Sequence, residues 1–205
     1  MNNKKIPEII IGRLPIYLRA LQHTAENGIK TISSQELGEL VGISAAQIRK
    51  DISQFGEFGK QGTGYSIEFL INKLCEILKV NQTWDVIVVG AGDLGHALAH
   101  YQGFKDRGFR VVAIFDNNKN KVGQTIGSFK VEDAAEMSER IRSLGVKIAV
   151  MTVPASAAQE VADVLVQAGI RSILNYAPVN VNVPSYVKVQ YSDPATNLQK
   201  MTYYL

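Results

Sequence analysis

The sequence predicts an α/β protein with two domains and a separate C-terminal helix. From residue 84 onward, apolar strand-like runs alternate with helical patterns, which is typical of a parallel sheet covered by helices. Before residue 80, apolar residues recur at helical spacing in short segments, and glycine-rich sequence follows them. A chain of 205 residues is long enough to bury two modest cores, so we expect one core in each part.

The composition is that of an ordinary globular protein, with 46% apolar and 20% charged residues. A net charge of +3 is too small to indicate a nucleic-acid partner by itself. The single Cys75 excludes a disulfide or a cysteine-based zinc site within one chain. The sequence has no run of about 18 apolar residues, and its polar start, MNNKK, lacks the apolar core of a signal peptide. We therefore expect a cytoplasmic protein with no membrane partner.

The N-terminal part begins with three predicted helices. Apolar side chains recur at helical spacing over residues 7–25, which predicts the first. Ser33 and Glu36 have the spacing of a capping box at the start of a second, short helix. Ser44 and Gln47 repeat that spacing at the start of the third. Because the second and third helices are joined tightly, the pair predicts a helix-turn-helix.

The third helix, residues 45–55, places Ile48 and Ile52 on one apolar face. The polar side chains that we expect elsewhere on this helix are Gln47, Arg49, Lys50, Asp51 and Gln54. Such a polar face suits the major groove of DNA, and nearby cations can neutralise phosphates. Two alternatives remain open for this domain, a dimerisation bundle and a winged helix that binds protein.

A glycine-rich segment follows at residues 55–70, FGEFGKQGTGYSIEFL, and predicts a β-hairpin wing, with a plain loop as the alternative. Residues 66–79 then place apolar side chains at helical spacing, and a short polar joint comes after them. The end of the first domain is therefore expected at residue 80.

The second domain opens with a strand and a glycine-rich turn. The apolar run over residues 86–89 suits a buried parallel strand, and Gly90, Gly92 and Gly95 follow it directly. In such a turn the first glycine allows the tight bend and the second lets backbone N–H groups approach a pyrophosphate. The third allows close packing of helix on strand. The pattern predicts a dinucleotide-binding site.

A second apolar strand, residues 111–115, ends at Asp116, which stands 21 residues after Gly95. An acid at this position accepts from a ribose 2′-hydroxyl and disfavours a 2′-phosphate, so we expect NAD(H) in preference to NADP(H). A basic, glycine-rich loop and an amphipathic helix from about Glu132 are predicted next. The loop is a plausible wall on the adenine side.

The βα alternation continues with a strand at residues 148–152, a helix at 155–168 and a strand at 173–175. Ligands of open α/β sheets lie beyond the carboxyl ends of the strands. The residues that we therefore expect near the nicotinamide half of the dinucleotide are Thr152, Val153, Pro154, Asn175 and Tyr176.

The chain ends with a predicted strand at residues 186–191 and a terminal helix capped by Ser192 or Asp193. The apolar residues Leu198, Met201 and Leu205 form one stripe on this helix. The stripe must pack either on its own domain or against another subunit, and both arrangements are physically sensible.

Six segments of the sequence form a recognisable set: RLPIYLRAL, AAQIRKDISQFGEFGKQGTGY, VGAGDLGHALAHY, FDNNKNKVG, TVPASAAQEVADVLVQAGI and ILNYAP. Together they resemble the Rex family of redox-sensing transcriptional repressors over essentially the whole chain. The resemblance implies a homodimer with winged helix-turn-helix DNA-binding domains (residues 1–80) and Rossmann-like NAD(H)-binding domains (81–191). It also implies C-terminal helices (192–205) exchanged between subunits.

The resemblance further implies a regulator, not an enzyme, whose dimer binds palindromic double-stranded operator DNA and leaves it when NADH binds. NADH and NAD⁺ are then effectors, and no catalytic residue or metal ligand is expected. The expected DNA-binding residues are Gln47, Arg49, Lys50, Ser53, Lys60, Gln61, Gly62, Gly64 and Tyr65. The expected cofactor-binding residues are Gly90, Ala91, Gly92, Asp93, Leu94, Gly95, Asp116, Thr152, Val153 and Pro154. A polar set expected to link domain and subunit comprises Arg19, Tyr101 and Asp193.

Two other functions remain open from the residues. A small dehydrogenase fused to a DNA-binding-like domain would need a positioned acid or base, and His23, His96 and His100 are the only histidines. None of them lies in a separate substrate domain. The second alternative is a regulator that binds CoA or an adenylate, because a glycine turn of this kind also serves other nucleotides.

Overall fold

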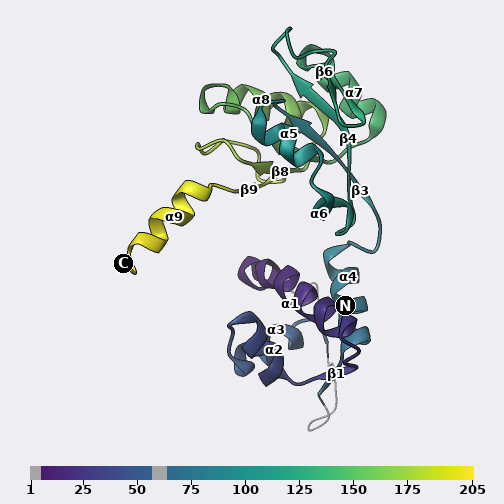
Figure 1. Ribbon diagram of the computed structural model, residues 1–205, viewed down its shortest axis with the longest axis vertical. Coiled ribbons are helices and arrows are strands. Elements are labelled where there is room, and N and C mark those ends of the chain that lie inside the picture. The colour runs from purple at the N-terminus through teal and green to yellow at the C-terminus, as the bar shows by residue number, and fades with distance from the viewer. Residues whose placement is uncertain (1–5, 57–63) are drawn as a thin grey trace. The chain divides into compact units, whose positions relative to one another are not determined.

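Figure 1 shows a computed structural model of the chain, in which residues 6–56 and 64–205 are described. The chain folds into two compact units, which divide between Gln82 and Thr83. Each unit has an apolar core of its own. Among the described residues, none of the helices combines the length and the apolar character needed to span a bilayer.

The N-terminal unit consists of helices and a small sheet. Its helices are α1 (Glu8–Glu26), α2 (Ser34–Val41), α3 (Ala45–Ser53) and α4 (Ile67–Leu78). Its strands are β1 (Thr31–Ile32) and β2 (Tyr65–Ser66), which pair antiparallel. The spacing of apolar residues predicted all four helices, and their apolar faces meet in one core around Leu14, Tyr17 and Ile48.

The helix starts follow from local hydrogen bonds. Ser33 Oγ accepts from the Glu36 N–H at 3.1 Å, and the Ser33 N–H donates to Glu36 Oε2 at 2.7 Å, so the predicted capping box forms at α2. At α3 only half of the second box forms. Ser44 Oγ accepts from the Gln47 N–H at 3.3 Å, whereas the Gln47 side chain bonds to Asp51 instead.

Part of the predicted wing, residues 57–63, lies outside the described residues. Its described strand, β2, pairs with β1, which lies ahead of the helix-turn-helix in the chain. Gly64 adopts a φ of +73°, and a Cβ there would stand 2.9 Å from the Ile32 carbonyl oxygen. Glycine therefore allows the chain to pass this close to β1.

The C-terminal unit is built on a seven-stranded sheet in the order β5-β6-β4-β3-β7-β8-β9. The strands are β3 (Trp84–Val89), β4 (Phe109–Asp116), β5 (Thr125–Ile126), β6 (Phe129–Asp133), β7 (Ile148–Met151), β8 (Ser172–Asn175) and β9 (Lys188–Tyr191). All neighbours pair parallel except β5 with β6. The chain starts at central β3, adds strands on one side and then crosses to β7, so the order reverses between β3 and β7.

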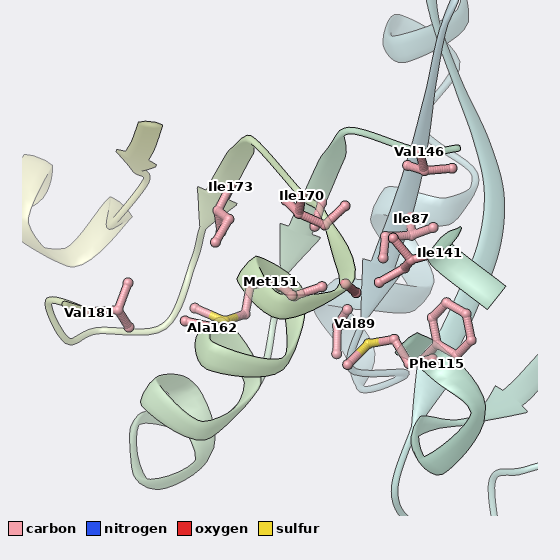
Figure 2. Packing of buried hydrophobic residues seen from close by; sticks show 14 of the residues in the cluster. Ile87, Val89, Phe115, Ile141, Val146, Met151, Ala162, Ile170, Ile173 and Val181 are labelled. Atoms are coloured by element: carbon pink, nitrogen blue, oxygen red, sulfur yellow. The ribbon is translucent and has the colours of Figure 1, made fainter. Parts of the chain in front are cut away.

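Helices cover both faces of this sheet. They are α5 (Asp93–Ala99), α6 (Gln102–Lys105), α7 (Met137–Leu144) and α8 (Ala155–Ala168), with a short 3₁₀ turn at Ala134–Glu136. A further helix, α9 (Pro194–Thr202), follows β9 and buries none of its residues on the sheet. Ile87 and Val89 point to the face covered by α7 and α8, as Figure 2 shows. Their neighbours Val86 and Val88 pack on the other face with residues of α5 and α6. This alternation is the two-residue period of a strand buried on both sides.

One predicted element was wrong. Glu132, expected at the start of a helix, lies in β6, and the helical part of this segment begins only after Asp133. Val131 is buried there against Ile114 of β4, so pairing with β4 determines the local structure.

Candidate functional site

The glycine turn after β3 brings the ends of two strands together. Gly90 has a φ of +103°, and a Cβ there would lie 2.6 Å from the backbone oxygen of Thr152. A Cβ at Gly95 would collide with the carbonyl oxygen of Gly90. At Gly92, by contrast, a Cβ would meet no described atom within 4 Å. The first and third glycines are therefore required by the packing of the chain itself, while the second faces open space.

Thr152, directly after β7, holds this turn. Its hydroxyl group lies 2.9 Å from the carbonyl oxygen of Gly90 and 3.1 Å from that of Val89, and its N–H donates to Val89 at 2.8 Å. Val153 is half-buried against the core of the unit, and the exposed Pro154 precedes α8. The three residues thus lie at the point where the strand order reverses, with Thr152 nearest to the glycines.

Asp116 connects the end of β4 to the same turn. The residue is only 7% exposed, and its Oδ2 accepts from the Ala91 N–H at 2.7 Å. Oδ1 accepts from the Asn118 N–H at 2.8 Å, and Lys121 Nζ lies 3.5 Å from Oδ2. A carboxylate has about four acceptor sites and three donors already lie beside this one, so about one site is left for a ribose hydroxyl. The Ala91 N–H, however, is already used within the protein.

The loop after β4 carries two cations beside this carboxylate. Lys121 pairs with Asp116, and Lys119 pairs with Asp133 at the end of β6. The Lys119 ammonium group, together with the Ala135 N–H, holds the pKa of Asp133 below its ordinary value. The sequence predicted this loop to be basic and to form a wall on the adenine side, and that wall stays a prediction. The two ion pairs could not be predicted, because the carboxylates that face the two lysines belong to strands.

The remaining residues of the turn begin α5. Asp93 and Leu94 are exposed in its first turn, and Gly92 precedes them as the N-terminal cap. At the end of β8, Asn175 is buried and its side chain makes two hydrogen bonds. It donates to the Val179 oxygen at 3.0 Å and accepts from the Ala177 N–H at 2.8 Å. Asn175 therefore shapes the loop after β8, and its expected position beside a nicotinamide stays a prediction.

A cavity of about 440 Å³ opens beside that loop, in the C-terminal unit. Its lining includes Ala177, Tyr191, Asp193, Thr196 and Lys200. No local pattern in the sequence indicates this space, because its walls come from a loop, a strand end and the first turns of α9.

Two of the three residues expected to link domain and subunit lie in the C-terminal unit. Tyr101 is exposed and makes an edge-to-face contact with Phe104, at 5.3 Å between ring centroids. Asp193 caps α9, accepting from the Thr196 hydroxyl at 2.7 Å and the Ala195 N–H at 2.9 Å. The Thr196 hydrogen bond holds the pKa of Asp193 below its ordinary value. Arg19 is exposed on α1 in the other unit, and the predicted link between the three stays a prediction.

On α3 the predicted polar face divides into two parts. Arg49, Lys50, Ser53 and Gln54 are exposed, and Arg49 donates to Ser34 Oγ at 2.9 Å. Asp51 was expected on the same polar face, which was wrong, because it is 0% exposed. It turns inward to Arg13 and Tyr17 of α1.

Other expected DNA-binding residues lie near or beyond β2. Gly64 and Tyr65 are half-buried at the start of β2. Lys60, Gln61 and Gly62 lie outside the described residues.

The terminal helix α9 is exposed along its whole length. Leu198 is 62% exposed and Met201 is 63% exposed in the single chain, and no residue of α9 is buried. Figure 1 shows α9 extending from the end of β9. Packing of the apolar stripe on its own domain, one of the two predicted arrangements, is therefore not what the chain adopts.

Each of the two units matches a known protein family. Residues 5–53 match the model of a putative DNA-binding protein N-terminus, and residues 81–179 match that of a CoA binding domain. A redox-sensing transcriptional repressor Rex of Chloroflexus aggregans is 50% identical to the chain, over 97% of this chain and 94% of that protein.

Solved structures also match the chain over nearly its whole length. The crystal structure of RSP in complex with β-NAD⁺ and operator DNA matches with a TM-score of 0.93 and 38% identity, over 98% of this chain and 93% of RSP. That of RSP in complex with β-NADH matches with a TM-score of 0.89 and 36% identity, over 98% and 95% of the two chains. RSP is itself described as a Rex-family repressor. With half of its residues identical to those of a Rex protein over nearly its entire length, this chain belongs to the Rex family of redox-sensing transcriptional repressors.

Proposed function

We propose that this chain is a homodimeric repressor that binds palindromic operator DNA and releases it when NADH occupies the glycine turn, thereby reporting the NADH/NAD⁺ ratio. The observation that carries the proposal is the arrangement of Gly92 and Asp116 at the reversal of strand order. The chain that contains it matches, from end to end, a repressor solved with β-NAD⁺ and operator DNA. NADH and NAD⁺ act here as effectors, and no reaction is assigned to the chain.

In the nucleotide site, Gly92 gives the pyrophosphate its close approach, because no described atom lies within 4 Å of its missing Cβ. Asp116 accepts from a ribose hydroxyl of the adenosine half. Its carboxylate repels a phosphorylated ribose, which favours NAD(H) over NADP(H) and over CoA. The residues proposed around the rest of the dinucleotide are Gly90, Ala91, Asp93, Leu94, Gly95, Thr152, Val153 and Pro154.

On the DNA side, α3 is the recognition helix, and its exposed Arg49 and Lys50 are the cations nearest to the phosphates. Ser53 lies one turn further along the same helix. The proposed set also includes Gln47, Lys60, Gln61, Gly62, Gly64 and Tyr65. The first 80 residues thus form the DNA-binding domain, and residues 81–191 form the nucleotide domain.

The dimer is proposed to form through the terminal segment, residues 192–205, which is exchanged between subunits. Two large apolar side chains, Leu198 and Met201, are more than half exposed on α9, and a second subunit would cover them. A two-fold axis also places two recognition helices on one face of DNA, roughly 34 Å apart. Arg19, Tyr101 and Asp193 would link domain to subunit in one of the two forms of the dimer, the DNA-bound form or the NADH-bound form.

We place this regulator in the cytoplasm, where chromosomal DNA and the nucleotide pool meet.

Coupling requires that NADH prefer the state that does not fit DNA. A typical coupling free energy of roughly 1 to 3 kcal/mol corresponds to a 5- to 150-fold loss of operator affinity. NAD⁺ and NADH differ in the charge and planarity of the nicotinamide, so an apolar wall near Val153 favours the neutral, reduced form.

The test is a titration of operator-bound protein with NADH, NAD⁺, NADPH and CoA, using a fluorescent duplex selected by the protein from a random pool. NADH is expected to release the duplex at the lowest concentration, and NADPH and CoA are expected to be weak. Equal release by NADH and NAD⁺ would contradict the proposal that the protein reports the NADH/NAD⁺ ratio. Release by CoA alone would favour a CoA-binding regulator, and turnover of NADH with a carbonyl compound would favour a dehydrogenase.

A further inference from the structure

The carboxylate of Asp51, on the recognition helix α3, is completely buried and accepts four hydrogen bonds. Arg13 of α1 donates to it twice, from Nε at 2.6 Å and from Nη2 at 2.8 Å. The Tyr17 hydroxyl donates at 2.7 Å. The fourth donor is Nε2 of Gln47, one turn earlier on α3, at 2.6 Å from Oδ1. The buried Asp51 carboxylate, which no ligand can reach, thus holds the side chain of Gln47 in the first turn of α3.

The charge of Asp51 is kept by its partners. Burial alone would raise the pKa of a carboxyl group, but the hydrogen bonds from Arg13, Tyr17 and Gln47 outweigh it and hold the pKa of Asp51 below its ordinary value. An ionised carboxylate can only accept hydrogen bonds. A protonated one, by contrast, could donate to the amide oxygen of Gln47.

This restriction decides which way the Gln47 amide faces. Asp51 can be met only by the nitrogen, so Nε2 points toward the buried carboxylate and Oε1 is directed away from it. Among the residues that the structure describes, none donates to Oε1 of Gln47. Nε2 carries a second hydrogen, so the amide keeps one acceptor and one donor for an outside partner.

Gln47 is the third residue of α3, and the first turn of a recognition helix is where side chains reach base edges in the major groove. An amide with an acceptor and a donor side by side matches the N6 amino group and N7 of adenine. The same edge mismatches guanine, which presents two acceptors at O6 and N7.

We propose that Asp51 is a positioning residue for base recognition, which touches no DNA but fixes the Gln47 amide so that Gln47 selects adenine at one position of each operator half-site. The inference rests on the proposed function, because it requires that α3 read DNA. It extends that function by assigning specificity at one base to a buried carboxylate that DNA never contacts.

The experiment uses full-length protein and two duplexes. The first is selected from a random pool by the wild-type protein, and the second carries guanine in place of adenine at the position where Gln47→Ala loses its preference. The wild type is expected to prefer the adenine duplex by about 5- to 150-fold. Gln47→Ala and Asp51→Asn should each bring this ratio close to one, and the double variant should lower it no further.

Tyr17→Phe is the matched control, because it removes a hydrogen bond from the same carboxylate and leaves the contact between Asp51 and Gln47 in place. It should lower thermal stability and keep the adenine preference. Adenine preference retained by Asp51→Asn would overturn the inference. The inference would also be overturned if Asp51→Asn lost its preference equally at every base of the half-site, because Asp51 would then only stabilise the fold of the domain.

A measurement on the wild type covers the case in which Asp51→Asn does not fold. In the ¹⁵N spectrum of the free protein, one hydrogen of the Gln47 side-chain amide should exchange with solvent far more slowly than those of the exposed Gln54. Equal exchange of both amides would contradict the contact. If the wild type enriches no sequence from the pool, the proposed DNA-binding function fails and takes this inference with it, whereas loss of the Asp51 effect alone leaves that function standing.

Discussion

The Thr152 hydroxyl group lies 2.9 Å from the carbonyl oxygen of Gly90, and this contact ties the end of β7 to the turn after β3. The two strands are neighbours in the sheet but lie more than 50 residues apart in the chain. The turn is therefore held in shape by the sheet before any ligand arrives. Preorganisation of this kind lowers the conformational cost of binding.

Removing this hydroxyl should weaken the nucleotide site without abolishing the fold. Thr152→Val leaves the Gly90 carbonyl oxygen without its donor, and loss of one such bond costs about 1 kcal/mol, or roughly a 5-fold weaker affinity for NADH. Thr152→Ser keeps the hydroxyl and is the matched control. NADH fluorescence titration of the three proteins measures the effect, and equal affinities in all three would show that the contact does not organise the turn.

The three glycines should respond differently to one added methyl group. Gly92→Ala meets no described atom within 4 Å, so the protein should keep its thermal stability while NADH binding falls, because the methyl group occupies the approach of the pyrophosphate. Gly95→Ala drives a methyl group against the Gly90 carbonyl oxygen and should lower stability by about 1 to 3 kcal/mol. Calorimetry and NADH titration on both variants separate the two effects. A Gly92→Ala protein that binds NADH normally would place the pyrophosphate elsewhere.

Asp116 should control the choice between NAD(H) and NADP(H). Asp116→Asn removes the negative charge that faces a 2′-phosphate and releases Lys121 from its ion pair. We expect NADH affinity to fall and NADPH affinity to rise, so that their ratio shifts by at least about 10-fold, or about 1.4 kcal/mol. Lys121→Met combined with Asp116→Asn should cancel the gain for NADPH. An unchanged ratio in Asp116→Asn would remove Asp116 from the ribose site.

The sequence predicted the elements that long apolar patterns define, and missed those that distant partners define. The run at 86–89 could be recognised as a buried strand because every residue in it is apolar, and the glycines after it have a known spacing. Glu132 was assigned to a helix because β6 is short and polar, and its pairing with β4 cannot be seen locally. The small strand β1 pairs with β2 across the whole helix-turn-helix, which no local pattern reports.

Single side chains of the site were also mispredicted or incompletely predicted where their partners lie far away in the sequence. Periodicity placed Asp51 on the polar face of α3, since an isolated carboxylate belongs in water. Its burial depends on Arg13, 38 residues earlier, and this pairing cannot be read from spacing. Likewise Asp116 was predicted to accept from a ribose, but its bond to the Ala91 N–H, 25 residues away, became visible only in the folded chain.

The N-terminal unit should lose stability in acid through Asp51. The folded-state pKa of this carboxyl lies below its ordinary value, which is about 3.9. Its contribution is therefore fully present above about pH 4 and is lost as the pH falls through the folded pKa. Tyr17→Phe removes one of the hydrogen bonds that lower this pKa, so the variant should have less stability to lose in acid, and its loss should end at a higher pH than in the wild type. Urea unfolding between pH 2 and pH 7, with the exposed Tyr203→Phe as control, measures this difference; coincident curves for all three proteins would contradict it.

The apolar stripe of α9 provides a test of the proposed subunit exchange. Leu198 and Met201 are more than 60% exposed in the single chain, so replacing both with Asp removes little packing that the chain makes by itself. If a second subunit covers them, two buried charges would cost several kcal/mol at that interface and the dimer should dissociate. Light scattering should then report the mass of a monomer for the double variant, and operator affinity should fall because two half-sites are no longer held together. Gln199→Asp, on the neighbouring face of the same helix, should remain dimeric. A double variant that stays dimeric would place the subunit interface elsewhere and leave α9 without a structural role in the dimer.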